Sequence, residues 1–380
     1  MGVLGNTTID TVSLMAMVMT LFLALGGFIF FKSKIYFGIQ SVWIIIIMSF
    51  NTYSVDWSSI EPLFEDTNKY NIFREGFFMS GYYYCSYLAK SLGMSFVTFN
   101  GIMVASATFL ICIIIYKYSK NPCIALSFFY FFPFIDSVIQ KKWYIAMALL
   151  IAGLPVLWRK GYKMVNAGVF LLIVLFACMF HTSSIFFITL VGLYIVPEKI
   201  RKYIVIMVFI LMNSLGSVFT GLVSKIQNNS IEGKSEVFFY KIAENSMSHY
   251  LFWCLWHLLF LMVIYVLLNK YKKRGEIDES FAKFLKLINL WSICIIPLYK
   301  FDPVFARLFR VVIIYNYIAI SNIFYINRLK IEKNRLLIIA FQIAICVISF
   351  VTFDVLAGIS FNELVLPIFQ NNEILNLFRH

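Results

Sequence analysis

Apolar segments close to the length of a bilayer span recur along the whole chain and alternate with short polar connections. A transmembrane helix needs about 20 mainly apolar residues, and several segments here are shorter. We therefore expect about twelve transmembrane helices, within a range of about 10–14. The expected helices lie at about 10–31, 35–53, 96–116, 122–135, 143–158, 164–180, 184–196, 203–222, 250–269, 285–299, 304–326 and 336–353. The pattern predicts an all-α, polytopic integral membrane protein with one transmembrane helical domain over residues 1–380.

The composition agrees with this interpretation. Hydrophobic residues make up 61% of the 380 residues, charged residues make up 13%, and the mean hydropathy is +0.84. Soluble domains carry about 25% charged residues, so a soluble fold is excluded. The net charge of +13 is typical of a membrane protein with basic cytoplasmic loops that face anionic lipid headgroups. Nucleic-acid binding is not expected, because the chain has no basic soluble stretch with interleaved aromatic residues.

The charges also predict the orientation in the membrane. If the predicted helices alternate from an external N-terminus, nearly all basic clusters face the cytoplasm, as the positive-inside rule requires. The same alternation places most acidic residues outside. The cytoplasmic clusters are Lys32/Lys34, Lys117/Lys120, Arg159/Lys160/Lys163, Lys199/Arg201/Lys202, Lys270/Lys272/Lys273/Arg274 and Arg328/Lys330/Lys333/Arg335.

Three longer segments are expected on the external side, at about 54–95, 224–249 and 354–380. The first contains EGFFMSGYYYCSYLAKSLG, which carries too many polar groups for an ordinary span. A helix that lies in the interface or re-enters the bundle suits it better, and its Tyr82–Tyr84 cluster is typical of an interfacial aromatic belt. No P-loop and no large cytoplasmic loop occur, which disfavours ATP-driven transport by this chain alone.

A metal site or another cofactor is not expected. The seven cysteines are scattered, mostly within apolar segments, and none forms a CxxC pair. The four histidines show no HExxH or other metal-ligand spacing.

Cationic side chains collect at the predicted external face. Lys141 and Lys142 stand at the outer start of the 143–158 helix. Arg307 and Arg310 lie near the outer end of the 304–326 helix, three residues apart and so on one helical face. Either pair could simply anchor the protein at the lipid interface. However, a guanidinium inside an apolar segment is costly without an anionic partner, and arginine forms forked hydrogen bonds to phosphate. We therefore expect these four residues to bind a diphosphate.

Candidate general bases lie on the same predicted face. His181 occupies an outer turn, and Asp56 and Glu61 open the first external segment. Each also has an ordinary interpretation, as a structural histidine or as a loop charge. A neutral histidine or a carboxylate can take a proton from an attacking hydroxyl, while cations stabilise a departing diphosphate. The pattern indicates glycosyl transfer from a polyprenyl diphosphate, without a metal or a nucleotide sugar.

Four stretches resemble motifs of the EpsG/Wzy-type bacterial polysaccharide polymerases. They are LGMSFVTFN (Leu92–Asn100), IQKKWYIAMAL, FHTSS with His181 and Ser183, and FARLFRVVIIYNY. In the second stretch Lys142 stands where the family usually has arginine. This difference keeps the charge and loses the forked geometry. The resemblance covers most of the chain in order and spacing.

The resemblance implies a multi-spanning, GT-C-like glycosyltransferase of the bacterial cytoplasmic membrane with an extracytoplasmic active site. Such enzymes join undecaprenyl-diphosphate-linked oligosaccharide units, as donor and acceptor, into O-antigen, capsular or exopolysaccharide chains. It also implies inverting, metal-independent chemistry. A partner protein that regulates chain length is a further expectation.

Other functions remain open at this stage. A flippase for lipid-linked oligosaccharides predicts charges at mid-membrane and access from both faces, whereas the charged candidates here cluster outside. An O-antigen ligase usually has a large late external loop, and the 224–249 segment is modest. A sugar O-acetyltransferase needs an early Arg/His signature, which the first two spans lack. A purely structural membrane protein is the remaining alternative.

Overall fold

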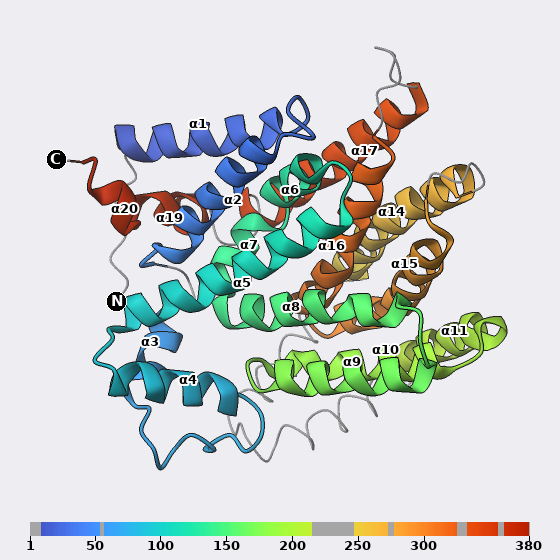
Figure 1. The fold of residues 1–380 in the computed structure, drawn as a ribbon, viewed down its shortest axis with the longest axis horizontal. Coiled ribbons are helices and arrows are strands. Elements are labelled where there is room, and N and C mark those ends of the chain that lie inside the picture. Colours follow the sequence, from blue (N-terminus) through green and yellow to red (C-terminus); the bar gives the residue numbers. More distant parts are fainter. Residues whose placement is uncertain are drawn as a thin grey trace. The chain divides into compact units, whose positions relative to one another are not determined.

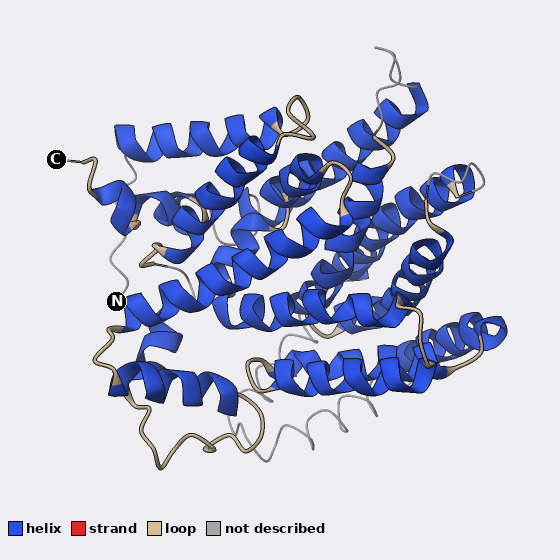
Figure 2. Ribbon diagram, in the orientation of Figure 1, coloured by secondary structure: helices blue, strands red, loops and turns tan. Residues whose placement is uncertain are grey.

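The predicted apolar segments form helices in the computed structural model, which describes residues 9–53, 57–214, 247–272, 277–324, 333–355 and 361–379 (Figure 1). Within these ranges the protein is all-helical, and the only β-type pairing is an isolated bridge between Asn51 and Asn372 (Figure 2). Helices satisfy their own backbone hydrogen bonds, which hydrocarbon surroundings require. The prediction of an all-α fold is confirmed.

Six helical segments among the described residues are long and apolar enough to cross a membrane. They are Phe96–Tyr118, Lys141–Trp158, Met247–Tyr271, Glu279–Lys300, Pro303–Asn322 and Lys333–Val355. Five shorter apolar helices cover further predicted spans: Thr11–Gly26, Lys34–Ser49, Pro122–Phe131, Lys163–Cys178 and Thr182–Ile195. The apolar segments therefore support a membrane protein, and the number of spans and the GT-C-like architecture stay predictions.

The chain divides into two compact units. The first comprises residues 1–152, 176–182 and 317–380, and the second comprises residues 153–175 and 183–316. The elements of the first unit are α1 Thr11–Gly26, α2 Lys34–Ser49, α3 Trp57–Glu65, α4 Ser80–Ser91, α5 Phe96–Tyr118, α6 Pro122–Phe131, α7 Phe134–Ile139, α17 Lys333–Phe350, the π-helical turn η5 Val351–Val355, α18 Phe361–Leu364, α19 Leu366–Gln370 and α20 Glu373–Asn376.

The described part of the second unit is built mainly from helices, with several 3₁₀ turns. Its elements are η1 Leu154–Trp158, α10 Phe187–Ile195, α11 Glu198–Ser214, α14 Met247–Tyr271, α15 Glu279–Ser292, η3 Ile293–Lys300 and η4 Pro303–Phe305. Four elements contribute residues to both units: α8 Lys141–Gly153, α9 Lys163–Cys178, η2 Thr182–Phe186 and α16 Ala306–Asn322. Of the expected external segment 224–249, residues up to 246 lie outside the described ranges.

Polar residues at the segment boundaries determine where several helices begin. Asp10, Ser33 and Ser95 each accept a hydrogen bond from a backbone N–H of the first turn, in α1, α2 and α5 respectively. These side chains satisfy donors that have no partner within the helix. These polar residues therefore define where the three helices begin.

Within the first unit, polar residues that follow α5 bond to residues at the C-terminal end of α16. The Ser119 and Ser321 hydroxyls lie 2.7 Å apart, and the Asn121 side-chain amide donates to the carbonyls of Ser321 and Phe324 at 2.6 Å each. The side chain of Asn322 in turn donates to the Tyr118 carbonyl. Because buried polar groups need partners, these residues fix the register between two helices about 200 positions apart in sequence.

The external segment near residue 80 differs from expectation in one respect. Tyr82 and Tyr83 are 2% and 0% exposed, whereas Tyr84 is 52% exposed. The assignment of this cluster to an interfacial aromatic belt is wrong for the first two tyrosines. They face inward because α4 packs against α3, and Tyr82 packs on the ring of Phe99 in α5.

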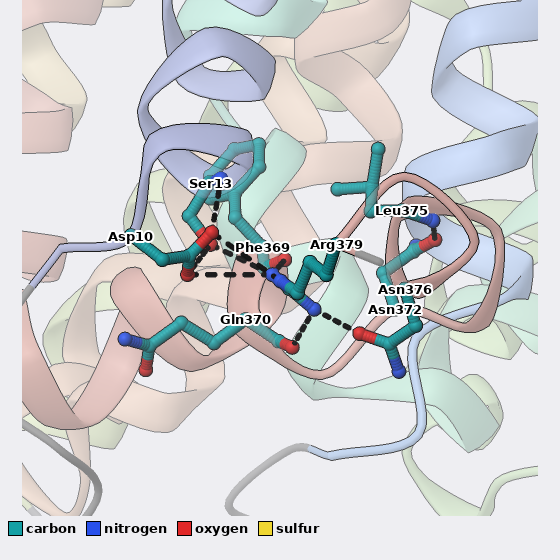
Figure 3. A network of polar contacts seen from close by, with 8 residues as sticks. All are labelled: Asp10, Ser13, Phe369, Gln370, Asn372, Leu375, Asn376 and Arg379. Atoms are coloured by element: carbon teal, nitrogen blue, oxygen red, sulfur yellow. Dashed lines mark hydrogen bonds and ion pairs between the residues drawn. The ribbon is translucent and has the colours of Figure 1, made fainter.

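The C-terminal tail is held against α1 by Arg379 (Figure 3). Its guanidinium donates to Asp10 Oδ1 (3.3 Å), to Ser13 Oγ (2.8 Å), to the side chain of Asn376, and to the carbonyls of Phe369 and Gln370. The helices α19 and α20 accordingly pack beside α1 (Figure 1). The fork of five N–H donors in arginine is suited to several acceptors at once.

We expect Arg379→Ala to lower the melting temperature of the detergent-solubilised protein by a few degrees, because hydrogen bonds to a charged group contribute about 1.5–3 kcal/mol. Arg379→Lys should have an intermediate effect, since an ammonium retains the attraction to Asp10 but cannot serve all the acceptors. An unchanged melting temperature in Arg379→Ala would contradict this account of the tail.

Candidate functional site

Lys141, at the start of α8, is enclosed within the first unit. Its side chain is 1% exposed, and its ammonium donates to the backbone carbonyl of Asn51 at 2.9 Å. The same nitrogen lies 4.5 Å from the centre of the Trp57 ring. A buried charge is tolerated only with such compensation. The structure therefore places this lysine inside the protein rather than at a headgroup.

Trp57 also contacts a second predicted residue. Its indole N–H donates to Glu61 Oε2 at 3.0 Å, one turn along α3. Lys141 and Glu61 thus share one aromatic neighbour, the lysine on the ring face and the carboxylate at the indole nitrogen. The third predicted residue of this region, Asp56, lies outside the described residues.

Lys142 points to a different aromatic ring. Its ammonium lies 5.9 Å from the ring centre of Tyr82 in α4, and its side chain is half-buried. The hydroxyl of Tyr82 is buried and has no hydrogen-bond partner among the described residues, as is also true of Asn51 Oδ1 and Asn100 Nδ2. Buried polar groups of this kind usually pair with water or a ligand. The adjacent lysines are therefore not equivalent.

His181 follows the C-terminal end of α9 and is half-buried. Its ring contacts that of Trp143 in α8 edge-on, with 5.3 Å between centres. Since Trp143 directly follows Lys142, the first turn of α8 contacts the histidine turn as well as Tyr82. Three aromatic rings thus bring the candidates of the first unit into one region. Trp57 contacts Lys141 and Glu61, Tyr82 contacts Lys142, and Trp143 contacts His181.

The first turn of α4 is attached to the chain just before His181. The backbone N–H groups of Met79 and Tyr82 donate to the carbonyls of Cys178 and Met179. Free N–H groups at one helix start thereby pair with free carbonyls at the end of α9. Between them, Gly81 approaches so closely that a Cβ there would lie 2.9 Å from the Met179 Cβ. Glycine permits this backbone contact.

The two predicted arginines belong to the second unit. Arg307 Nη2 donates to Ser183 Oγ at 2.9 Å, which joins the FARLFR stretch to the FHTSS stretch. Arg310 follows one turn later on α16 and is only 6% exposed. Of the four charged residues from Lys300 to Arg310, three are cationic. The single carboxylate, Asp302, is buried and caps η4 through the Val304 N–H. This part of the second unit therefore has net positive charge suited to a phosphate.

A buried polar chain accompanies Arg310. His257 of α14 is 0% exposed and lies between Tyr299 OH (2.7 Å) and Ser292 Oγ (3.0 Å), with its ring stacked on Phe309. Phe309 directly precedes Arg310 in α16, so this chain lies beside the arginine. Sequence reasoning missed this chain, because a histidine within an apolar helix gives no sign of its partners, 35 and 42 residues away.

The Tyr83 hydroxyl adds a further polar contact outside the predicted spans. It donates to Glu75 Oε1 at 2.6 Å, and Arg74 lies over its ring. Burial and the hydrogen bond to this carboxylate raise the pKa of Tyr83 above its ordinary value. The tyrosine is therefore a neutral donor at physiological pH, and it ties the connection before α4 to the helix.

Comparison with known protein families identifies the chain. The model of the EpsG family matches residues 34–367. The chain belongs to the EpsG family. Searches of curated proteins and of solved structures found no significant match.

Membership of the EpsG family indicates a polysaccharide polymerase-like activity and lipid-linked saccharide substrates at a membrane. The match includes every motif that suggested the resemblance, from Leu92 to Tyr317. The expectation of this family from sequence is confirmed. The roles of the individual residues stay predictions.

We expect Gly81→Ala to reduce polymer formation, because the added methyl would push α4 away from the carbonyl of Met179, and overpacking costs about 1–3 kcal/mol. The measurement is polysaccharide yield and length in cells that carry the variant as the sole copy. Gly38→Ala in α2 is a matched control, since a Cβ there meets nothing within 4 Å. Equal polymer from both variants would show that the close approach is dispensable.

Proposed function

We propose that this EpsG-family protein polymerises undecaprenyl-diphosphate-linked oligosaccharide units at the outer face of the bacterial cytoplasmic membrane. The growing chain would pass from its lipid carrier to a new lipid-linked unit. The observation that carries the proposal is the hydrogen bond from Arg307 to Ser183, within the family match. It joins two family-like motifs at an arginine, and an arginine is suited to bind a diphosphate through charge-assisted hydrogen bonds.

In the proposed reaction, a hydroxyl of the acceptor sugar attacks the anomeric carbon of the donor. The bond from that carbon to the diphosphate oxygen breaks, and the electron pair leaves with the diphosphate. Arg307 and Arg310 would stabilise the charge that grows on this leaving group. A base accepts the hydroxyl proton. Direct displacement of this kind inverts the anomeric configuration and needs no metal.

We assign His181 as the leading candidate for the base, with Glu61 and Asp56 as alternatives. The histidine is partly accessible and its ring is oriented by Trp143. The Glu61 carboxylate is already oriented by the indole N–H of Trp57, which donates to Oε2 at 3.0 Å. Each residue has a neighbouring aromatic ring that holds it in place, and a general base must be held in a defined position.

We assign the two lysines different roles. The ammonium of Lys142 is half-buried beside Tyr82 and is the one suited to contact the diphosphate as a mobile point charge. Lys141 is enclosed and bonded to the Asn51 carbonyl, so it acts by positioning the start of α8. The sequence led us to expect that both lysines bind the diphosphate. In this proposal only Lys142 contacts it.

The proposal is tested first by deleting the gene in its native host. Loss of long surface polysaccharide, with single repeat units left on the lipid carrier, is the expected result. Normal-length polysaccharide in the deletion strain would overturn the proposal. The same strain then serves as host for the variants below.

We expect Arg310→Ala and His181→Ala each to reduce polymerisation by about 100-fold or more, since loss of a charge-stabilising donor or of a general base has this effect. Polymer length on gels is the measurement, with protein level checked by immunoblot. Arg159→Ala, at an exposed arginine of the second unit, is the matched control and should behave as wild type. Wild-type polymer in both site variants at normal protein level would refute the site assignment.

Arg307→Lys tests the forked contact separately. A lysine keeps the charge but cannot donate to Ser183 Oγ and a phosphate oxygen in the same geometry, so we expect about a tenfold or greater loss of polymerisation rate. Retained activity would indicate that simple positive charge suffices at this position.

A further inference from the structure

An apolar cavity lies within the second unit, between α10, α11 and the α15–η3 segment. Its volume is about 490 Å³, within the range of small-molecule sites. Its lining includes Phe186, Gly192, Trp291, Cys294 and Leu298. One wall belongs to the 22-residue segment Glu279–Lys300, which is long and apolar enough to cross a membrane.

Among the described residues, the chemistry of the lining suits an apolar ligand. Of its described residues, Thr189 alone carries a hydroxyl. That hydroxyl accepts from the Trp291 indole N–H at 2.8 Å and donates to the Phe186 carbonyl at 2.6 Å. Both polar side chains are thereby used within the wall. What faces the cavity is hydrocarbon, aromatic surface and the sulfur atoms of Cys294 and Met212, so a hydrocarbon chain fits without an unpaired polar group.

The cavity is next to the arginine cluster of the same unit. Its lining residue Phe186 packs edge-on against Phe305, with 5.6 Å between ring centres. Phe305 is two residues before Arg307, and Arg307 bonds to Ser183, three residues before Phe186. Another lining residue, Leu298, is two residues before Lys300. A molecule whose hydrocarbon chain fills the cavity can therefore carry an anionic head at the cationic residues.

We infer that this cavity binds the isoprenoid chain of the lipid carrier, with the diphosphate head at Arg307 and Arg310. The inference rests on the proposed function and adds the site for the apolar part of the substrate. Two observations support it. One wall of the cavity belongs to a segment that is long and apolar enough to cross a membrane, and the cationic residues next to the cavity match the charge of the diphosphate. Acyl chains of ordinary phospholipids share the apolar chemistry, and they lack the diphosphate that matches the arginines.

Gly192 offers a variant that fills the cavity without disturbing the fold. It lines the cavity, and a Cβ built there meets nothing within 4 Å, so the side chain in Gly192→Leu would occupy the space for the ligand. Gly168→Leu in α9 is the matched control, since a Cβ there is equally unobstructed and the residue does not line the cavity. Both changes remove a helical glycine and so have the same direct effect on helix propensity.

The first measurement is photo-crosslinking of the full-length protein in nanodiscs, with a polyprenyl diphosphate that carries a diazirine on its isoprenoid chain. We expect crosslinks on peptides of α10, α11 or η3 in wild type and in Gly168→Leu, and a loss of about tenfold or more in Gly192→Leu, the scale for changes of pocket shape. Unlabelled polyprenyl diphosphate should compete, and excess phospholipid should not.

Three results of this experiment would overturn the inference. One is undiminished crosslinking in Gly192→Leu. Another is equal labelling of the same peptides by a diazirine phospholipid that polyprenyl diphosphate does not displace, which would assign the cavity to bulk lipid. The third is crosslinking confined to peptides elsewhere in the chain, which would mean that another part of the protein or a second copy covers the cavity.

A polymerisation assay separates this inference from the proposed function. With lipid-linked repeat units, Gly192→Leu should raise the KM for the donor while Gly168→Leu matches wild type. If wild type polymerises and Gly192→Leu is unchanged, the cavity assignment fails and the proposed function stands. If wild type forms no polymer but is crosslinked in the cavity, the proposed function fails and the isoprenoid site stands.

Discussion

The need to pair polar groups inside an apolar protein determines the first unit more than any other constraint. The ammonium of Lys141 is enclosed, and the carbonyl of Asn51 is the acceptor that compensates for its lost hydration. The Asn51 side chain in turn donates to carbonyls of the C-terminal tail, at Ile368 and Asn371, and the Thr52 N–H donates to the latter carbonyl. One buried charge therefore lies at the centre of a set of contacts that joins α8, the end of α2 and the tail.

The candidate site follows from the same constraint at helix ends, where backbone groups lack partners within the helix. The start of α4 takes its acceptors from the end of α9, and the contact is close because residue 81 is glycine. This attachment places Tyr82 near Lys142 and beside the turn that carries His181. In the second unit, Arg307 near the start of α16 donates a hydrogen bond to the hydroxyl of Ser183. Several candidate side chains, including Lys141, Lys142, His181 and Arg307, thus stand near helix ends, where backbone groups lack partners within the helix.

Much of the fold was predictable from the chain alone. The apolar segments coincide with helices because hydrophobicity at this length leaves few other structures, and Asp10, Ser33 and Ser95 cap where their residue types predict. The charged candidates were also recognisable, because Arg310 and Lys141 are anomalous in apolar sequence. The partners were not predictable. Lys141 and Lys142 are adjacent and identical in type, yet one is enclosed and the other is accessible, and the buried chain of His257, Tyr299 and Ser292 has no signature in spacing.

The sequence by itself determined the helical class, the membrane character, the family and the residue types that we propose for the diphosphate site, because each depends on composition, local periodicity or motif order. Only the tertiary structure decided which lysine is buried, that Tyr82 and Tyr83 face inward, that Arg307 bonds to Ser183, and that an apolar cavity adjoins this pair. Those outcomes depend on contacts between residues distant in the chain. Such contacts are selected by packing and by the pairing of buried polar groups, which no local pattern encodes.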